Sequence, residues 1–598
     1  MSLFLVKYRG CLREYLIFLR INVFALSEWH FGFQSYYFIQ IFMRHHPLVS
    51  FLPLLSASFL GANTPLAWTQ FVADSEAGRA SALPDYSYAG YKYGTEAIPD
   101  VTWKTFDVTD YGALPNDELS DYAGIQRAIR AAEANGSGVV FFPPGKFLVA
   151  EGPGVSTPIE INAPNIVLRG SGSYTGGTEI HQKYHFLPED EGKKWTVPPV
   201  FVFRHSTSRV HLLRNRDQAV KLASVTQTAG RETFTLQVDS VADIEPGQTV
   251  MVCAQGVELN NYFLQALTPR DNFTEILKNG VSVSEKHIVR SIEGNRLTFV
   301  EPIRADIDPQ LVEWTIYDYP TIEGWGVEDL HFSGNCPVPF VHHKNFIHNS
   351  GYQGIRMEQG INSWIRRCRF TDMSGAFLAS GCLSSSFLLN TIDGNQGHTN
   401  FSMNWGGGNL IGLSQDLTDL GSFHGPGISH ENVGGVVWRY ESVGTTPQTP
   451  RYGGPDFHAQ FPYSSLWDAC RANLIDNGGN YTLLPNHLRD LTFWNFEQIG
   501  IKKVNYDFWK QPVSHADFKN LYYGGVKIVY PNLIGFHGVA TTFNRKHLGI
   551  FESHGKPVDI ESLYEAQLAL RLGTAPKWIE DTKQEWIKVR AMHKSSAR

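Results

Sequence analysis

Short apolar segments recur at a nearly constant interval in the second half of the chain. They are SWIRRCRFTDM, SSFLLNTIDGN and GNLIGLSQ, and their centres Ile365, Phe387 and Leu410 are 22 and 23 residues apart. One coil of a β-helix, with three short strands and three turns, needs about this many residues, and solenoid repeats span about 20–50 residues. The interval therefore predicts a stack of β-coils, each burying its apolar face against its neighbours.

A helix followed by a buried strand precedes these repeats, in FDVTDYGALPNDELSDYAGIQRAIRAAEANGSGVVFFPPGKFLV (residues 106–149). Ser120 is expected to cap the helix, Asn135-Gly136 ends it, GVVFFP is typical of a fully buried strand, and Pro143-Pro144-Gly145 predicts a turn. One apolar stripe with helical spacing supports the assignment: Ile125, Ala128, Ile129 and Ala132. We expect the helix to cover the open end of the solenoid, which otherwise exposes its apolar core and unpaired strand edges.

This segment resembles the start of the pectate-lyase-like right-handed parallel β-helix superfamily. The matching residues are Asp107, Tyr111-Gly112-Ala113, Asp117, Ile125-Gln126, Ala128-Ile129 and the FFPPGKF turn. The chain also resembles an uncharacterised secreted branch, associated with bacterial polysaccharide degradation, in LPDYSYAGY (83–91), the DFH and PYSSLW loop, TFWN and SLYEAQLALRL. The resemblance covers most of residues 84–573. It implies an all-β fold: a right-handed single-stranded parallel β-helix with an N-terminal capping helix, a small β insertion and C-terminal helices.

The chain is expected to have four parts. Residues 1–42 show no domain-like pattern and are interpreted as an over-extended start or an unstructured segment. Residues 43–67, with a short basic start, an apolar run and small residues, predict a signal peptide, and a membrane-associated N-terminal segment is the alternative. Residues 84–540 form the β-helix domain, with a β insertion at about 205–305 where EPGQ and EGNR indicate hairpins, and residues 541–598 are helical. We expect a secreted or periplasmic bacterial protein.

Composition excludes some partners. The net charge of −7 includes no basic block, which argues against nucleic acid as a partner. The 6 cysteines form no CxxC pair and no zinc spacing, and are too sparse for a disulfide scaffold. Free buried thiols are expected, and one isolated bridge remains open. After removal of the signal peptide we expect no membrane contact, and a monomer or a small homo-oligomer.

The stretch GPDFHAQFPYSSLWDACRANLIDNGG (454–479) breaks the regular pattern of strands and turns. Asp456 and His458 point the same way in an extended chain, about 6–7 Å apart. A carboxylate beside an imidazole orients it and raises its pKa, as a general base requires. Asp468 is a further catalytic candidate, and Tyr463 and Trp467 are expected to stack on sugar rings. Under the alternative interpretation, the two aspartates cap turns and the aromatic residues close the solenoid.

Two other polar turns carry histidines: NQGHTNFSMNW, with His398 and Asn400, and SFHGPGISHENV, with His424, His430 and Glu431. Because coils stack, turns from different coils can line one groove. We therefore add His398 and His424 to the catalytic candidates. A hydrogen-bonded turn residue is the alternative for each histidine.

The stretch VHHKNFIHNSGYQGIRMEQG (341–360) adds binding candidates. Lys344, Arg356 and Arg451 are expected to neutralise carboxylates or sulfates of a substrate, with ordinary surface charge as the alternative. Tyr352 and Glu358 complete the predicted binding set. The stretch contains His342, His343 and His348, but neither HxxxH nor HExxH on a helix, and no metal site is predicted.

The resemblance implies a polysaccharide substrate, expected to be acidic, in a groove formed by the turns of residues 340–470. We favour a lyase acting by β-elimination, with His458 or a Lys or Arg as the base. No cofactor is firmly expected, although Ca²⁺ stays open as one that could neutralise a uronate. The alternative is a glycoside hydrolase that pairs Asp456 with Asp468 or Glu358. A non-catalytic glycan-binding protein is the second alternative.

Overall fold

The computed structural model describes residues 63–150, 152, 157–206, 219–418, 427–442, 453–510 and 526–596. The predicted N-terminal segment and nearly all of the predicted signal peptide lie outside these ranges. Helix α4 (Leu66–Glu76) begins within the last residues of that peptide. No helix among the described residues is long and apolar enough to cross a membrane.

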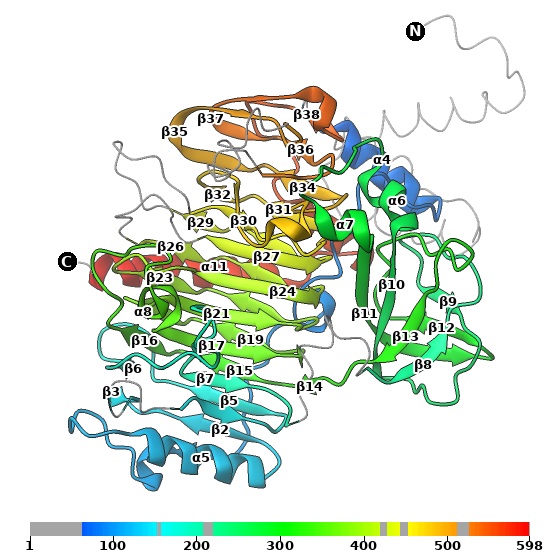
Figure 1. Ribbon diagram of the computed structural model, residues 1–598. Helices are drawn as coiled ribbons and strands as arrows, with labels where there is room; N and C mark the ends of the chain where they lie inside the picture. Colours follow the sequence, from blue (N-terminus) through cyan, green and yellow to red (C-terminus); the bar gives the residue numbers. More distant parts are fainter. Residues whose placement is uncertain are drawn as a thin grey trace, which may run out of the picture. The chain divides into compact units, whose positions relative to one another are not determined.

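Three parallel sheets run along a solenoid (Figure 1), and outside the insertion the coils between β2 and β35 visit them in the order A, B, C. Sheet A contains β1 (Thr105–Asp107), β2 (Gly138–Phe141), β5 (Ile166–Arg169), β15 (Gly326–Glu328), β19 (Trp364–Arg366), β22 (Ser386–Leu388), β25 (Leu410–Gly412), β28 (Val436–Trp438), β31 (Ser465–Asp468), β34 (Leu491–Trp494), β36 (Asn532–Ile534) and β38 (Phe551–Glu552). Sheet B contains β3 (Gly145–Leu148), β6 (Thr178–Gln182), β16 (His331–Gly334), β20 (Arg369–Thr371), β23 (Thr391–Asp393), β26 (Gln415–Asp416), β29 (Glu441–Ser442), β32 (Arg471–Ala472), β35 (Glu497–Tyr506) and β37 (His537–Phe543). Sheet C contains β4 (Ile159–Ile161), β7 (Phe201–Phe203), β17 (Gln353–Glu358), β21 (Gly375–Ser380), β24 (Phe401–Gly407), β27 (Ile428–Val433), β30 (Pro455–Phe457) and β33 (Asp476–Asn477). This architecture confirms the predicted parallel β-helix.

The register of sheet A corrects one of the three predicted strand centres. Ile365 pairs with Phe387 as expected, but Phe387 pairs with Ile411. Leu410 pairs with Ser386, one position earlier, and its side chain packs into an apolar layer outside the solenoid. Inside, aromatic rings of successive coils stack, as Phe377 does on Phe401 with ring centroids 4.9 Å apart.

Helix α5 (Tyr122–Ala134) covers the first coil at one end of the solenoid (Figure 1). Its four predicted stripe residues are all buried. The residue that precedes the helix is Asp121, and the predicted cap Ser120 lies one position earlier, in a bridge to Leu148. The Asp121 carboxylate accepts a hydrogen bond from the Leu148 amide at 2.7 Å, which ties the helix start to sheet B.

The β insertion is a six-stranded antiparallel sheet beside the solenoid (Figure 1). Its strands are β8 (Lys221–Ser224), β9 (Thr235–Gln237), β10 (Thr249–Gly256), β11 (Val281–Glu293), β12 (Arg296–Phe299) and β13 (Thr315–Asp318), and its short helices are α6 (Asn260–Leu264) and α7 (Thr274–Lys278). The segment EGNR joins the paired strands β11 and β12, as predicted. The hairpin expected around EPGQ is wrong, because β9 pairs with β12 whereas β10 pairs with β11 and β13. The last strand ends at Asp318, beyond the expected limit of about 305.

The C-terminal part differs from the expected helical segment at 541–598. Strand β37 continues to Phe543 because it pairs with β35, and β38 adds a further strand to sheet A. The helices α10 (Leu563–Leu572) and α11 (Lys577–Ser596) follow. Together with α4 and residues 83–89, they bury an apolar layer on the outer face of sheet A.

The cysteines behave as expected where the structure describes them. Cys336, Cys368, Cys382 and Cys470 are buried free thiols, and Cys253 is buried as well. Cys11 lies outside the described residues.

Candidate functional site

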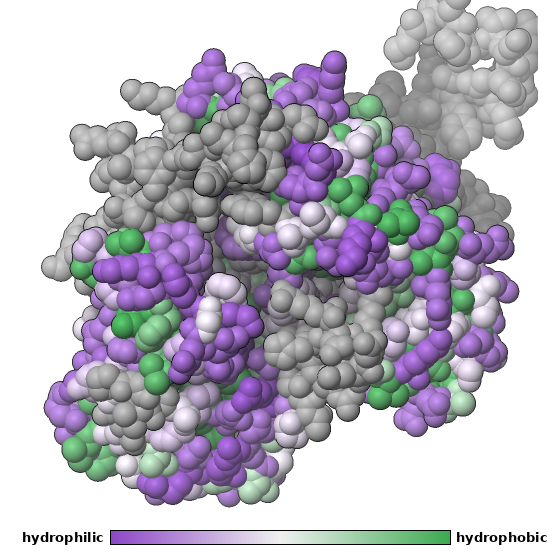
Figure 2. Space-filling view, in the orientation of Figure 1, coloured by the Kyte–Doolittle hydropathy of each residue, from purple (hydrophilic) through white to green (hydrophobic). Residues whose placement is uncertain are grey.

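The outer face of sheet C carries a row of side chains that successive coils place next to one another. Because side chains alternate along a strand, residues between inward-pointing neighbours point outward. The inward neighbours in successive coils are Ile355, Phe377, Phe401 and Ile428, all buried. The outward row, in register from β17 to β33, is Arg356, Leu378, Ser402, Ser429, Asp456 and Asp476. The view of the molecule in Figure 2 shows mostly hydrophilic residues with scattered hydrophobic ones.

Asp456 and His458 meet at this face, at the end of β30. The Nδ1 atom of His458 lies 3.2 Å from Oδ2 of Asp456 and 3.0 Å from Oγ of Ser429. Both side chains are partly exposed, at 31% for His458 and 24% for Asp456. When the Nδ1–H group donates a hydrogen bond to the carboxylate, Nε2 of the neutral ring is a hydrogen-bond acceptor, which is the form a general base needs. The structure thus brings this predicted pair together.

Gly478, in the next coil, packs directly against the His458 ring. A Cβ atom added at residue 478 would be 2.4 Å from Nε2 and 2.6 Å from Cδ2 of His458. No real Cβ tolerates such a distance, so any other residue at 478 moves the imidazole. Glycine at 478 thus leaves room for the ring in its present position beside Asp456.

Asp476 is a site residue that sequence reasoning missed. It pairs in register with Asp456 on the adjacent strand, and both side chains are partly exposed. Neighbouring strands lie about 4.7–4.9 Å apart, so the two carboxylates face the same space. Asp476 follows Asp456 by 20 residues, close to the coil interval, and this spacing was the signal that could have identified it.

His398 lies at another corner of the solenoid, in the turn between β23 and β24. Its ring centroid is 5.1 Å from those of both His342 and His343, which follow β16 in an earlier turn. Burial lowers the pKa of His343, and the charges of Lys194 and His458 lower it further, whereas the neighbouring Asn349 side chain raises it. His343 and His458 are therefore electrostatic neighbours.

The predicted cation Arg356 lies on the outward row, but it is already paired with acidic groups. Its guanidinium lies 3.0 Å from Glu358 and 3.6 Å from Glu189. Lys344 is exposed in the same loop as His343. Tyr352, in contrast, is 6% exposed and packs against Cys336 and Phe340 beneath the surface, so its assignment to substrate binding is corrected.

Asp468 has a structural role, and its assignment as a catalytic residue is corrected. It is fully buried in sheet A and accepts hydrogen bonds from the start of α10. The donors are the Ser562 hydroxyl, the Leu563 amide at 2.8 Å and the Tyr564 amide at 3.2 Å. Burial raises the pKa of Asp468 to about 7, despite these hydrogen bonds, which lower it. No substrate reaches this carboxyl.

The two predicted stacking aromatics are also corrected. Trp467 is 0% exposed inside the solenoid, between the rings of neighbouring coils. Tyr463 is 1% exposed, and its hydroxyl donates a hydrogen bond to Glu285 of the insertion. A sequence shows that a residue is aromatic but not on which side of the strand it points. His424 and Arg451 lie outside the described residues.

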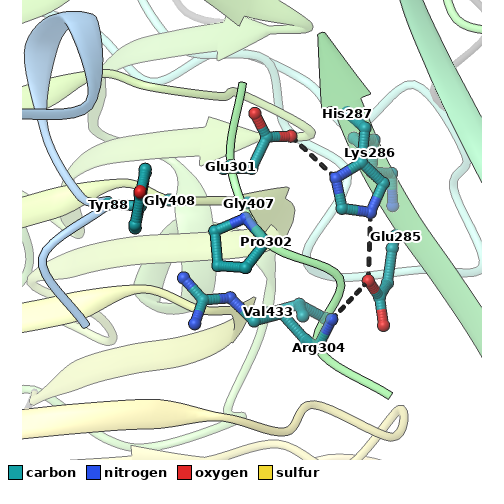
Figure 3. A pocket seen from close by; sticks show the side chains of 10 residues that line it. All are labelled: Tyr88, Glu285, Lys286, His287, Glu301, Pro302, Arg304, Gly407, Gly408 and Val433. Atoms are coloured by element: carbon teal, nitrogen blue, oxygen red, sulfur yellow. Dashed lines mark hydrogen bonds and ion pairs between the residues drawn. The ribbon is translucent and has the colours of Figure 1, made fainter. Parts of the chain in front are cut away.

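A second cluster of titratable groups joins the insertion to the solenoid (Figure 3). His287 lies between two carboxylates, 3.0 Å from Glu285 and 2.8 Å from Glu301. Although burial lowers the pKa of His287, these two hydrogen bonds raise it to about 9. Arg304 donates its backbone amide to Glu285 and a side-chain N–H to the Asp85 carbonyl. The cavity here measures about 20 Å³, which is room for about one water molecule and too small for a sugar. We therefore interpret this cluster as a structural contact between the insertion and the solenoid, called the joint below.

Two family models match parts of the chain. Residues 105–196 match a model described as rhamnogalacturonase A/epimerase, pectate lyase-like, and residues 421–582 match a domain of unknown function, DUF4955. A search of curated proteins found no match.

Several solved structures are similar at low identity. The tailspike protein gp49 from Pseudomonas phage LKA1 is 11% identical with a TM-score of 0.39, over 72% of this chain and 64% of that chain, so the chain spans less than two thirds of that protein. The A-module of the mannuronan C-5 epimerase AlgE6 from Azotobacter vinelandii is 13% identical, over 75% of this chain and 98% of that one, with a TM-score of 0.30. A hyperthermoactive exopolygalacturonase from Thermotoga maritima is 13% identical, over 77% and 92% of the two chains, with a TM-score of 0.28.

The sheet topology and the family model at the first coils agree with the resemblance found in the sequence. The described residues form a parallel β-helix, and its first coils match the pectate-lyase-like family model.

Proposed function

We propose that this protein is a carbohydrate-active enzyme that cleaves glycosidic bonds of a polysaccharide bound along the outer face of sheet C. The observation that carries the proposal is the register pairing of Asp456 with Asp476, with His458 bound to Asp456. The description of the family model that matches residues 105–196 supports a carbohydrate as the substrate. Of the two candidate reactions, the paired carboxylates favour hydrolysis over the β-elimination expected from the sequence.

In hydrolysis, one carboxyl group protonates the leaving oxygen while the other acts on the anomeric carbon or on a water. Carboxyl groups about 5–5.5 Å apart are typical of retaining enzymes, and about 6.5–9.5 Å of inverting ones. Adjacent strands hold aligned side chains about 4.7–4.9 Å apart, which supports the retaining mechanism. Asp456 is the better nucleophile, because the Nδ1–H group of His458 beside it stabilises the carboxylate that leaves when the intermediate is hydrolysed. Asp476 is then the acid.

A second candidate function is β-elimination on a uronate-containing chain. It is favoured by the Asp456–His458 contact, which orients the imidazole and leaves Nε2 as an acceptor. In this reaction His458 removes the proton α to the substrate carboxylate. The exposed Lys344 is a candidate partner for that carboxylate.

The test is a panel of acidic and neutral polysaccharides, with new reducing ends and the absorbance of unsaturated uronates measured in parallel. Reducing ends without the absorbance, and with a retained anomeric configuration by NMR, support the proposed hydrolase. Reducing ends together with the absorbance support the lyase instead. Binding to a polysaccharide with neither signal overturns the enzymatic proposal and leaves a glycan-binding protein.

A further inference from the structure

Three histidines from two distant turns converge at one corner of the solenoid. His342 and His343 lie in the connection from β16 to β17, and His398 in the connection from β23 to β24. Each offers one ring nitrogen, and these three atoms all lie within 4.8 Å of one another. The ring centroids of His342 and His343 are 3.8 Å apart.

The backbone explains how two consecutive histidines share one side of the chain. In an extended segment, neighbouring side chains point to opposite faces. His343 has a φ of 57°, in the left-handed region that non-glycine residues rarely adopt. This turn brings its ring back towards His342. Such strained positions persist where the surrounding structure holds them, and they cluster at binding sites.

Contacts around the three rings hold both turns. The Lys194 ammonium donates to the His343 carbonyl at 2.8 Å, and the Val341 amide donates to Nδ1 of His348 at 3.2 Å. The amide of His398 donates to the Ser374 carbonyl at 2.8 Å, which attaches the second turn to sheet C. Asn349, 2% exposed, is near His343, and its buried side-chain amide atoms have no hydrogen-bond partner among the described residues, so it is available to orient a ligand ring. Buried outer-shell groups of this kind orient metal ligands.

The geometry points to a zinc-binding site formed by His342, His343 and His398. Three imidazoles with a fourth position open to water or a substrate oxygen are a ligand set of zinc, whereas Ca²⁺ and Mg²⁺ prefer oxygen ligands. A tetrahedral ion with Zn–N bonds of about 2.0–2.1 Å needs nitrogens about 3.3–3.4 Å apart. The exposed His343 ring can rotate to close the remaining distance.

Zinc binding here does not depend on the reaction proposed above, and its test needs no substrate. Full-length protein without a histidine tag is stripped with a chelator, dialysed against Zn²⁺ and analysed for bound metal and by calorimetry. The variants are His343→Ala, His398→Ala and Asn349→Ala. His554→Ala is the matched control, because its ring hydrogen-bonds Thr541 in another part of the solenoid.

One zinc ion per chain is expected in the wild type and in the control. It is expected to be lost in both histidine variants, with affinity lowered about 10–100-fold in Asn349→Ala. X-ray absorption is expected to show three nitrogen ligands at about 2.0–2.1 Å. Circular dichroism confirms that each variant is folded. Absence of stoichiometric zinc in the wild type, or zinc retained by a folded His398→Ala variant, overturns the proposal.

Discussion

The imidazole of His458 lies directly against Gly478, so closely that a methyl group on residue 478 would be 2.4 Å from its Nε2 atom. The same ring contacts Asp456 through its other nitrogen. The close contact with Gly478 in one coil therefore limits where the imidazole of His458, in the preceding coil, can lie.

Substitution of Gly478 by alanine is expected to move the His458 ring away from Asp456. Displacement of a catalytic group by about 1 Å can cost about 100-fold in rate, so kcat is expected to fall by about that factor while the fold persists. Gly230→Ala is the control, because its added Cβ has no neighbour closer than 3.9 Å. Equal kcat values for the two variants would remove His458 from the mechanism.

Asp456→Asn and Asp476→Asn are each expected to lower kcat about 10²–10⁴-fold, the range of a lost acid–base group. The kcat of the double variant is expected to lie within a small factor of the kcat of the less active single variant. Residues that act as a unit do not have additive effects on the rate. Asp581→Asn, on the exposed side of α11, is the control, with kcat unchanged. Full activity of either site variant on the best substrate of the panel would contradict the carboxylate pair.

The joint between insertion and solenoid is expected to weaken at alkaline pH. The pKa of His287 is raised from 6.5 to about 9, so its stabilisation is complete below pH 6.5 and is lost as the pH rises through 9. A shift of this size corresponds to on the order of 3 kcal/mol. Denaturant unfolding of the wild type and His287→Gln, at pH 6 and at pH 10, measures the difference in unfolding free energy. The difference should shrink at the higher pH, and a constant difference would refute the assignment.

Asp468→Ala is expected to destabilise the protein without changing the chemistry of the site. It leaves the Ser562 hydroxyl and two backbone amides of α10 without their acceptor, at about 1–3 kcal/mol for a buried unpaired group. Thermal unfolding measures the loss, and kcat measured well below the new melting temperature is expected to equal that of the wild type. A large drop in kcat with unchanged stability would restore Asp468 as a catalytic residue.

The scaffold could be predicted from the sequence because it depends on the spacing of apolar residues along the chain. Ile365 and Phe387 lie one coil apart, and the stripe on α5 follows the helical period, so both could be recognised from neighbours in the chain. The Asp456–His458 pair was predictable for the same reason, since two residues of one extended segment point the same way.

The remaining site residues depend on contacts between coils. Asp476 becomes a partner of Asp456 only through the register of β30 with β33. His398 meets His342 only because two turns that are far apart in the sequence lie at one corner. Asp468 and Trp467 are adjacent on one strand, and one faces the added helix α10 while the other faces the interior. Their different environments cannot be predicted without knowing that α10 packs on the outer face of sheet A.

The covered face of sheet A has a consequence for how the molecule comes apart. In a simple solenoid each coil contacts only its neighbours, so the ends can fray separately. Here Gln567 of α10 hydrogen-bonds the Tyr86 amide, Trp578 bonds the Gly94 carbonyl, and Glu585 pairs with Arg367. The C-terminal segment also pairs with Arg439 through Glu565 and accepts a hydrogen bond from Trp494 at the Ile560 carbonyl, so it contacts coils that do not touch one another. Because these coils share one covering layer, the release of one coil disturbs contacts of the others, and we expect the domain to unfold as a single cooperative unit.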